Sequence, residues 1–360
     1  MRPAVVASVL GVAFLALAPV GALATPRTQP AESSGRLRSD SDAVQRLQAA
    51  VEEARNAAFD ARLLVVAFDT DGPSVVELEV SQSRGDLRVS HGEAWALGRS
   101  RARGYFTQAG ELLQLGSVES PGFRPVRLTS KYAVRSVPSQ DLDTGPAEPI
   151  EVIERDRQVL RERLYVDRGT GLVVRRETFD GAGEPVRLAV FTQVRLRDQP
   201  MRGVAAVDEG GTRAPTPLTD ESLAILADVG WRVPKELPAG FELQGGYALP
   251  ESEGGSMHLV YSDGLYTLSL YEQFGRLDSD SLQGAVPVSW GDVHAFTWPG
   301  SQPERMVWSG DGLTFTVVSD APADALVEVT SELPHGQAPS LPGRMVRGLG
   351  RVLDWAWPFN

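Results

Sequence analysis

The sequence predicts an α+β protein built mostly from antiparallel strands, and three observations lead to this fold class. One amphipathic helical pattern stands near the start, and about eight short strand patterns with local turns follow it. A stretch rich in proline and glycine then separates them from a second group of strands and helices. We therefore expect a strongly curved antiparallel sheet that holds the first helix on its concave face, followed by a smaller α+β domain.

The first 24 residues have the pattern of a secretory signal peptide. Arg2 supplies one positive charge, an apolar run extends over residues 4–20, and the small residues at 22–24 (Ala-Leu-Ala) suit a cleavage site. An uncleaved membrane anchor is the alternative, and Pro19 with Gly21 favours cleavage. We expect an exported protein in the periplasm or another extracytoplasmic space, with residues 25–40 as a disordered lead.

Charge and cysteine content exclude several classes of protein. The formal net charge is −12 over 360 residues, and no basic stripe of the kind that binds nucleic acid is present. The chain has no cysteine. It therefore has no disulfide and no thiol to carry a lipid anchor, so its cores alone must hold it together.

The first predicted domain covers residues 41–197. Asp40, Ser41 and Asp42 can cap its helix, whose apolar stripe we predict to comprise Val44, Leu47, Val51, Ala54 and Ala58. In residues 74–83 the side chains alternate, so that Val76, Leu78 and Val80 share one face of a strand and Val75, Glu77 and Glu79 share the other. Residues 63–68 and 127–137 are also predicted strands.

Residues 198–218 are a predicted linker, and the second domain covers residues 219–340. Thr219 or Asp220 can cap a short helix that carries Leu223, Leu226 and Ala227. Strands follow, and the stretch DAPADALVEVTSEL predicts a last helix with Asp320 as its cap and Pro322 as its first residue.

The stretch HLVYSDGLYTLSLYEQF, residues 258–274, has two interpretations. His258 stands near Ser256 and Ser262, so a hydrolase that uses one of these serines is conceivable. However, an Asp/Gly loop between two alternating arms recurs in VWSGDGLTFTVVS and in YVDRGTGLVVRRE. This repetition favours a hairpin turn, in which Gly264 takes a positive φ.

The sequence contains no further pattern of a catalytic, metal or nucleotide site. The four histidines (His91, His258, His294 and His335) are far apart, and no phosphate-binding or dinucleotide-binding motif is present. We therefore expect no enzyme activity, no cofactor and no bound metal.

Residues 341–360 can form an amphipathic tail. The apolar side chains Met345, Leu349, Val352, Leu353 and Ala356 share one face, and Arg344, Arg347, Arg351 and Asp354 share the other. Such a segment could lie on a membrane, bind a partner, or pack on its own domain; Gly348 and Gly350 weaken it as a free helix.

Four stretches resemble the RseB/MucB family, whose members are exported proteins that regulate envelope-stress sigma factors. They are GWRVPKELPAGFEL, HLVYSDGLYTLSLY, the segment from MVWSGDGLTFT to SELPHG, and RLYVDRGTGLVVRRETFDGAGEPVRLAVFTQV. The combination of Trp231, Leu237-Pro238, Gly240-Phe241 and residues 261–265 (YSDGL) carries most of this resemblance.

The resemblance implies an open half-barrel that holds an apolar cavity against helices, as in lipoprotein carriers, followed by a smaller α+β domain. It also implies a function: negative regulation of sigma-factor signalling by binding the extracytoplasmic part of a membrane-spanning anti-sigma factor and shielding it from proteolysis. A lipid or lipoprotein ligand in the cavity would release that partner. A periplasmic lipid or lipoprotein carrier is the alternative.

Two groups of candidate site residues follow, and ordinary core packing is the competing explanation for each residue. The cavity candidates are Val76, Leu78, Val80, Leu164, Val166, Val190 and Val194. The candidates for partner binding or for a structural motif are Trp231, Phe241, Tyr261, Asp263, Gly264 and Trp308.

Overall fold

The structure is a computed structural model and describes most of the chain from residue 37 to residue 335. The described ranges are 37–69, 72–83, 86–91, 94–99, 102–107, 125–142, 145–197, 216–249, 256–279, 282, 284–298 and 304–335. The predicted signal peptide, the predicted lead up to residue 36, linker residues 198–215 and the tail lie outside these residues. Within them, no helix is both long and apolar enough to cross a membrane.

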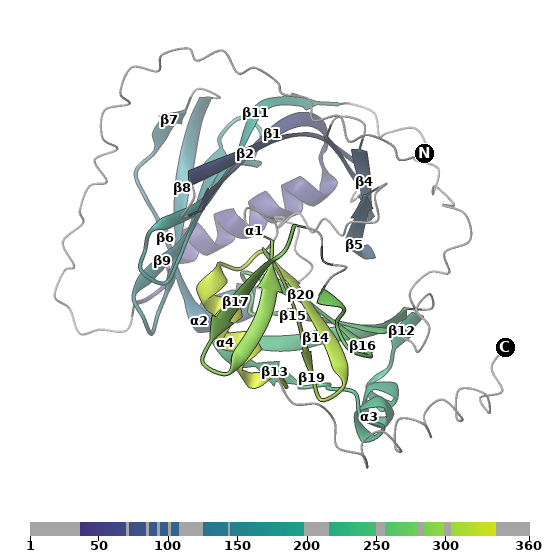
Figure 1. The fold of residues 1–360 in the computed structure, drawn as a ribbon. Coiled ribbons are helices and arrows are strands. Elements are labelled where there is room, and N and C mark those ends of the chain that lie inside the picture. The colour runs from purple at the N-terminus through teal and green to yellow at the C-terminus, as the bar shows by residue number, and fades with distance from the viewer. Residues whose placement is uncertain are drawn as a thin grey trace, which may run out of the picture. The chain divides into compact units, whose positions relative to one another are not determined.

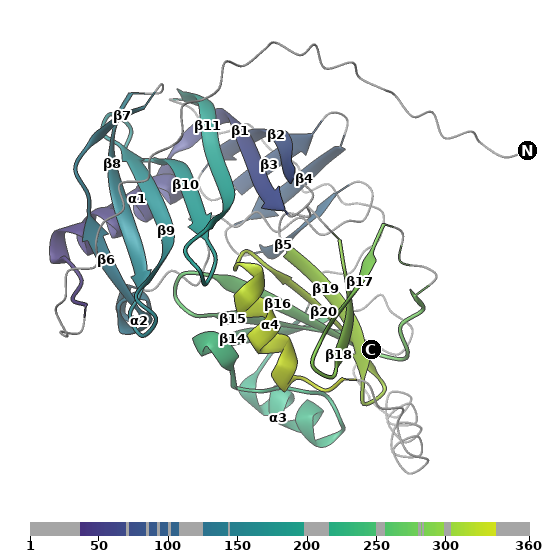
Figure 2. The same ribbon diagram turned by 60° about the vertical axis from the view of Figure 1, so that its left-hand side comes forward.

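Eleven antiparallel strands form the first sheet, in the order β5-β4-β3-β2-β1-β11-β10-β9-β8-β6, and β7 pairs with β8. The sheet arches over helix α1, which runs along its inner side (Figures 1 and 2). The strands are β1 (Ala58–Asp69), β2 (Gly72–Ser83), β3 (Asp86–His91), β4 (Ala94–Arg99), β5 (Ala102–Thr107), β6 (Tyr132–Ser136), β7 (Gln140–Leu142), β8 (Gly145–Glu154), β9 (Val159–Asp167), β10 (Val173–Phe179) and β11 (Pro185–Leu196).

Helix α1 (Ser41–Asn56) begins where the sequence predicts. Asp40 is the N-cap, and its Oδ1 accepts the backbone N–H of Asp42 at 2.9 Å, which satisfies one of the free donors of the first turn. Leu47 and Ala54 are buried against the sheet, as expected. Ala58, the last residue of the predicted stripe, instead begins β1.

One predicted strand is partly a helix. Residues 127–137 were expected to be extended, but α2 (Pro125–Lys131) occupies the first part and β6 the rest. Arg155 donates from Nε and Nη2 to the Thr129 carbonyl oxygen at 3.2 and 3.1 Å, and Leu128 is fully buried. These contacts come from residues distant in sequence, so local alternation could not indicate them.

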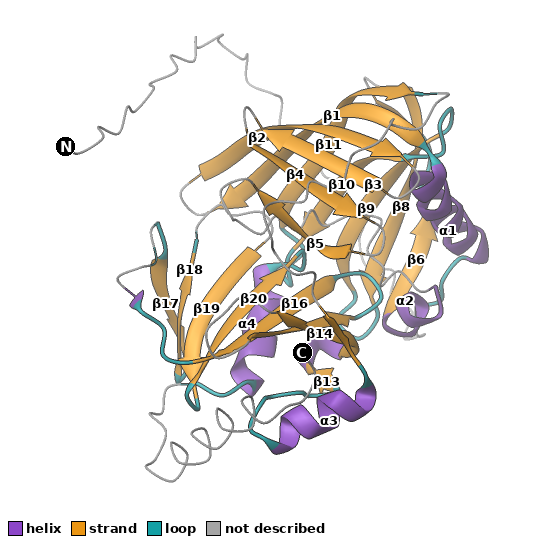
Figure 3. Cartoon of the chain, turned by 90° about the vertical axis from the view of Figure 1, so that its right-hand side faces the viewer, coloured by secondary structure: helices purple, strands orange, loops and turns teal. Residues whose placement is uncertain are grey.

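The second sheet has nine antiparallel strands in the order β12-β14-β15-β16-β20-β19-β18-β17, and β13 pairs with β14. Figure 3, in which strands are orange and helices purple, shows that strands make up most of the regular structure around both sheets. The strands are β12 (Thr216–Leu218), β13 (Glu236–Leu237), β14 (Phe241–Leu249), β15 (Ser256–Ser262), β16 (Thr267–Phe274), β17 (Val286–Trp290), β18 (Val293–Thr297), β19 (Glu304–Gly310) and β20 (Leu313–Ser319). The α+β fold class is confirmed.

Helices α3 (Asp220–Asp228) and α4 (Ala323–Glu332) accompany this sheet, and a 3₁₀ turn lies at Pro238–Gly240. Thr219 caps α3 as predicted, because its hydroxyl accepts the Ser222 N–H at 3.1 Å. The cap predicted for α4 is wrong: α4 begins at Ala323, with Pro322 at the cap position and no side-chain cap. Asp320 has other partners, described below.

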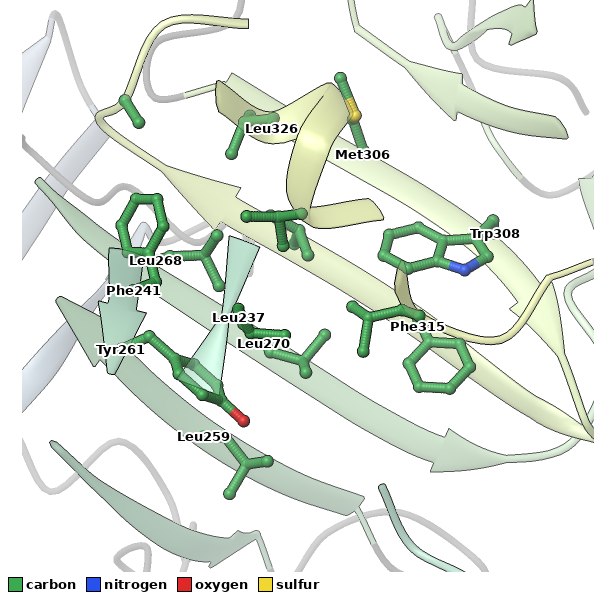
Figure 4. Packing of buried hydrophobic residues seen from close by; sticks show 14 of the residues in the cluster. Leu237, Phe241, Leu259, Tyr261, Leu268, Leu270, Met306, Trp308, Phe315 and Leu326 are labelled. Carbon is green, nitrogen blue, oxygen red and sulfur yellow. The ribbon is translucent and has the colours of Figure 1, made fainter. Parts of the chain in front are cut away.

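Below, "first domain" means the first sheet with α1 and α2, and "second domain" means the second sheet with α3 and α4. Both belong to one compact unit, Leu37–Asn360. The second domain has a continuous apolar core between its sheet and α4, which Figure 4 shows from close by.

The three repeated Asp/Gly stretches are hairpins, as predicted. They connect β15 with β16, β19 with β20, and β9 with β10. The turn between β19 and β20 has positive φ at both Asp311 (50°) and Gly312 (78°), the combination that a tight two-residue hairpin requires.

Candidate functional site

The inner face of the first sheet, defined as the face that α1 covers, carries most of the cavity candidates. Leu78 lies opposite Leu63 and Val80 opposite Ala61, and directly paired residues share a face. This cluster includes Ala54 of α1. A second cluster joins Leu47 and Ala50 of α1 to Leu164, Ile150 and neighbouring side chains. The face is therefore apolar along the length of the helix.

The seven cavity candidates do not all lie on this face. Leu78, Val80 and Leu164 are buried there, and Val166 and Val194 pack beside them, partly buried. Val190 instead pairs with Leu64 and Arg175, the residues that alternate with the inner ones, and so it lies on the outer face. Alternation alone does not predict the register of β11, because its pairing with β1 has a bulge opposite Arg62 and Leu63.

Val76 marks the place where the inner face is open. It lies opposite Val65, in phase with Leu78 and Val80, yet it is 39% exposed while Leu78 is 7% exposed. Apolar surface that remains accessible beside a buried apolar face suits an apolar ligand.

A charged cluster also lies on the inner face, in the same cross-strand row as Val76, because Val76 pairs with Val65, Val65 with Ala189 and Ala189 with Arg176. Arg176 lies opposite Leu164 and Thr178 opposite Glu162, which places these charged side chains in phase with the apolar ones. Arg176 donates from Nε and Nη2 to the two carboxylate oxygens of Glu162 at 2.9 and 2.8 Å. Thr178 donates its hydroxyl to Glu162 at 3.1 Å. Such a forked arrangement is the strong form of a buried ion pair.

Asp320 of the second domain completes this cluster. Its carboxylate lies 3.6 Å from Arg176 Nη1 and accepts the Thr267 N–H at 2.7 Å. Burial raises the pKa of Asp320, and the positive charges of Arg176 and Arg187 offset part of that rise. For Arg176, burial alone would lower the pKa, but the charge of Glu162 outweighs it and the pKa is raised. Each charge thus depends on its partner to remain ionised.

A second buried arginine forms a parallel link between the domains. Arg161 donates from Nε to Glu154 in its own domain at 2.8 Å and from Nη1 to Asp324 in α4 at 2.9 Å. Tyr266 donates its hydroxyl to the Arg161 carbonyl oxygen at 3.3 Å. The contact between the domains therefore includes ionic and polar pairs made by β9 and β10 of the first sheet.

The stretch 262–266 forms the third link, at α2 and β6. Asp263 Oδ1 accepts the N–H groups of Leu265 and Tyr266 at 2.9 and 2.8 Å, which closes the turn. Asp263 Oδ2 accepts the Tyr132 hydroxyl at 2.5 Å and the Lys131 ammonium at 2.6 Å, both from the first domain. Burial, and then the Asp263 charge, raises the pKa of Tyr132 well above its ordinary value.

Gly264 has a φ of +96°, so the predicted turn is confirmed. The turn is also pressed against α2, because a Cβ at this position would lie 2.6 Å from the Leu128 backbone nitrogen. Leu265 packs against the same first-domain cluster that contains Leu128. We call these three links together the junction: Asp263, Asp320 and Asp324 on the second-domain side, with Lys131, Tyr132, Arg161 and Arg176 on the first-domain side.

The aromatic candidates lie in the second-domain core. Trp231, Phe241, Tyr261 and Trp308 are all buried in one cluster (Figure 4 labels the last three). Their side chains hold the domain together and are not exposed to a partner in this structure.

With Ser262 as the nucleophile, the hydrolase interpretation lacks its geometry. Ser262 and His258 are four residues apart on one strand, which separates their Cα atoms by about 13 Å. Ser262 donates its hydroxyl to the Tyr266 carbonyl oxygen at 2.9 Å, and His258 stacks on Tyr271 with ring centroids 4.3 Å apart. Among the described residues, no group of three or more histidine and acidic side chains could hold a metal ion.

Sequence reasoning missed the ionic part of the junction, although a signal was present. In RERLYVD and VVRRETF, Glu162 and Arg176 occupy the same alternation phase as buried apolar residues. Opposite charges in the buried phase of two adjacent strands indicate a paired interior cluster.

Comparison with known proteins gives structural neighbours only. No family model matches the chain, and no curated protein matches it. The "Crystal structure of MucB in complex with MucA(peri)" covers 82% of this chain and all of that one, at 20% identity and a TM-score of 0.47. The complex of Pseudomonas aeruginosa MucA/MucB matches over the same shares at 21% identity and 0.47.

A LolA superfamily protein from Nitrosomonas europaea matches 43% of this chain and 94% of its own, at 14% identity and a TM-score of 0.23. MucB is thus among the solved structures to which this chain is similar.

Proposed function

We propose that this chain is an exported, non-enzymatic regulator that binds the extracytoplasmic part of a membrane-spanning anti-sigma factor and shields it from proteolysis. One observation carries the proposal: the stretches that resemble the RseB/MucB family contribute much of the second-domain core and, at the junction, Arg176, Asp263, Asp320 and Asp324. Trp231 and Phe241 lie in that core, and Asp263 links the two domains. The resembling residues therefore contribute both to the second domain and to its contact with the first, which supports the proposal.

The release of the partner by a lipidic ligand is the second part of the proposal. The inner face of the first sheet is largely apolar, and at Val76 part of this apolar surface remains accessible. The charged cluster that reaches Asp320 in the second domain lies in the same cross-strand row as Val76, at Arg176. A ligand that moves the inner strands would therefore act on the junction as well, and so on a partner bound across both domains.

The same accessible apolar surface at Val76 also favours the alternative, a periplasmic carrier of lipids or lipoproteins. A carrier needs an apolar face that takes up a ligand, but it needs no anti-sigma partner. The two functions are separated by what the protein binds in the cell.

The test is affinity purification of the whole chain from its own cells after crosslinking, together with mass spectrometry of the native protein. Specific enrichment of a membrane anti-sigma protein supports the regulator. Stoichiometric lipid without a protein partner supports the carrier and refutes the regulator. Val76→Glu should abolish lipid binding, while Val75→Glu, its neighbour on the outer face at 61% exposure, should retain it.

A further inference from the structure

Helix α3 presents an apolar patch on the side away from the core. Leu223 is buried and Leu226 packs against the second-domain core, so these two residues hold the helix in place. Ile225 is 46% exposed and Val229, directly after the helix, is 38% exposed. A separation of four residues places them one above the other on a helix surface.

Acidic side chains surround this patch. Asp220, Glu221 and Asp228 are exposed, and the helix contains no lysine or arginine. None of the three forms an ion pair with another described residue. We call Asp220, Glu221, Ile225, Asp228 and Val229 the α3 outer surface. Its chemistry suits a helix with an apolar stripe and positive charges.

The described chain ends close to this surface. The Pro334 carbonyl oxygen accepts the Trp308 Nε1–H at 3.0 Å, and Pro334 and His335 lie against Gly310. Asp311, which follows Gly310, forms an ion pair at 2.6 Å with Arg232, and Arg232 lies four residues after the end of α3. Residues 336–360 therefore start from the same corner of the domain in which α3 ends.

The segment that starts there has the complementary sequence. Residues 341–360 carry Arg344, Arg347 and Arg351, three positive charges for the three acidic residues of α3, and an apolar face formed by Met345, Leu349, Val352 and Leu353. The nine residues from His335 to Arg344 can span about 30 Å, whereas α3 is only about 14 Å long. The linker is thus long enough to lay the tail along α3 in either direction.

We propose that residues 341–360 dock on the α3 outer surface of their own chain and cover Ile225 and Val229 with their apolar face. The arginines of the other face then reach around the edge of the tail helix, on their long side chains, to Asp220, Glu221 and Asp228. The tail is then part of the second domain and does not form a membrane anchor. This inference is independent of the proposed anti-sigma partner and of any lipid ligand.

The absence of cysteine allows a clean test, because an introduced pair is the only pair of thiols. Ala224→Cys on α3 is combined with Ala356→Cys in the tail, and the whole chain is treated with a short bis-maleimide. The matched control combines Ala356→Cys with Val126→Cys, which is exposed on α2 in the first domain. We expect at least tenfold more internal crosslink for the α3 pair, with a yield that is independent of protein concentration.

Two further variants test the chemistry of the contact. Ile225→Asp with Val229→Asp, both at exposed positions, should lower the crosslink at least fivefold with an unchanged melting temperature. Replacing Arg344, Arg347 and Arg351 by Glu should also lower the crosslink at least fivefold, and it changes no residue of the described domain. One molar salt should weaken the contact, because it screens exposed charges beyond about 3 Å.

Three results would overturn the proposal. The first is an equal yield for the α3 pair and the control pair. The second is a crosslink between molecules that grows with protein concentration, which indicates a second copy on α3. The third is a tail that sediments with vesicles of phosphatidylcholine and phosphatidylglycerol through its arginines while the α3 crosslink is absent.

Discussion

Tyr132 donates its hydroxyl to Asp263 at 2.5 Å, although 131 residues separate the two in sequence. Tyr132 begins β6 of the first domain, and Asp263 is the turn residue between β15 and β16 of the second. The same carboxylate also organises its own turn through the N–H groups of Leu265 and Tyr266. A residue that forms a hairpin turn in one domain therefore also binds that domain to the other.

Replacing this carboxylate should weaken the whole junction. Asp263→Asn keeps an oxygen for the turn but presents an amide to Lys131 and Tyr132, two donors that then lose their acceptor. We expect a loss of about 3 kcal/mol in the free energy of unfolding, as for a broken buried pair. Tyr132→Phe removes one donor and should cost about 1 kcal/mol.

Urea unfolding measures both values, and the exposed pair Arg46–Glu148 supplies the control. Glu148→Gln should change stability by less than about 1 kcal/mol, because exposed ion pairs contribute little. If Asp263→Asn lowers the free energy of unfolding no more than Glu148→Gln does, the junction does not depend on Asp263.

Gly264→Val should destabilise the fold more than the same change at another glycine of similar conformation. Gly183 has a φ of +82°, and a Cβ there meets nothing within 4 Å. Gly183→Val should therefore cost only the backbone strain, about 1–3 kcal/mol. Gly264→Val adds a collision with the Leu128 backbone at 2.6 Å. Equal melting temperatures of the two variants would contradict close packing of the turn on α2.

The sequence predicted the parts of the fold that local rules determine. Alternation identified the inner phase of β2 through Leu78 and Val80, and the Asp/Gly loops identified three hairpins. Capping chemistry placed the start of α1 at Asp40. In each case the residues that carry the signal are neighbours in the chain, so their effect does not depend on how the domains meet.

The misses have a common cause. Asp320 was expected to cap α4, but its carboxylate instead accepts Thr267 N–H and faces Arg176, 144 residues earlier. Val190 was assigned to the inner face, but a bulge in the pairing of β11 with β1 changes the phase. Partners from distant strands decided both positions, and local patterns do not contain that information.

Removing Arg176 alone should lower the stability of the fold more than removing Arg176 together with Glu162. In Arg176→Met the buried Glu162 carboxylate loses its forked partner, which should cost about 3–5 kcal/mol. In the double variant Arg176→Met/Glu162→Met neither charge of the pair remains, and we expect part of the stability to return. A double variant that is as unstable as the sum of the two single variants would show that the two side chains do not act as a pair.

Glu272 should make the stability of the chain fall as the pH rises. It is buried in the second-domain core, where it accepts the Arg232 N–H at 2.9 Å. Burial raises its pKa to about 8, and the Arg232 N–H and charge offset part of the rise. The folded state therefore holds a proton that the unfolded state releases near pH 4.5. The stabilisation is complete below that pH and is lost as the pH rises through about 8.

Glu272→Gln keeps an acceptor for Arg232 but cannot ionise. The variant should match the parent below pH 4.5 and exceed it at pH 8, by a margin on the order of a few kcal/mol. Thermal melting between pH 4 and pH 9 measures the difference, with the exposed Glu332→Gln as the control that should follow the parent at every pH. A pH profile of Glu272→Gln parallel to that of the parent would mean that Glu272 is ionised in the fold, and that its contact with Arg232 is enough to stabilise the charge.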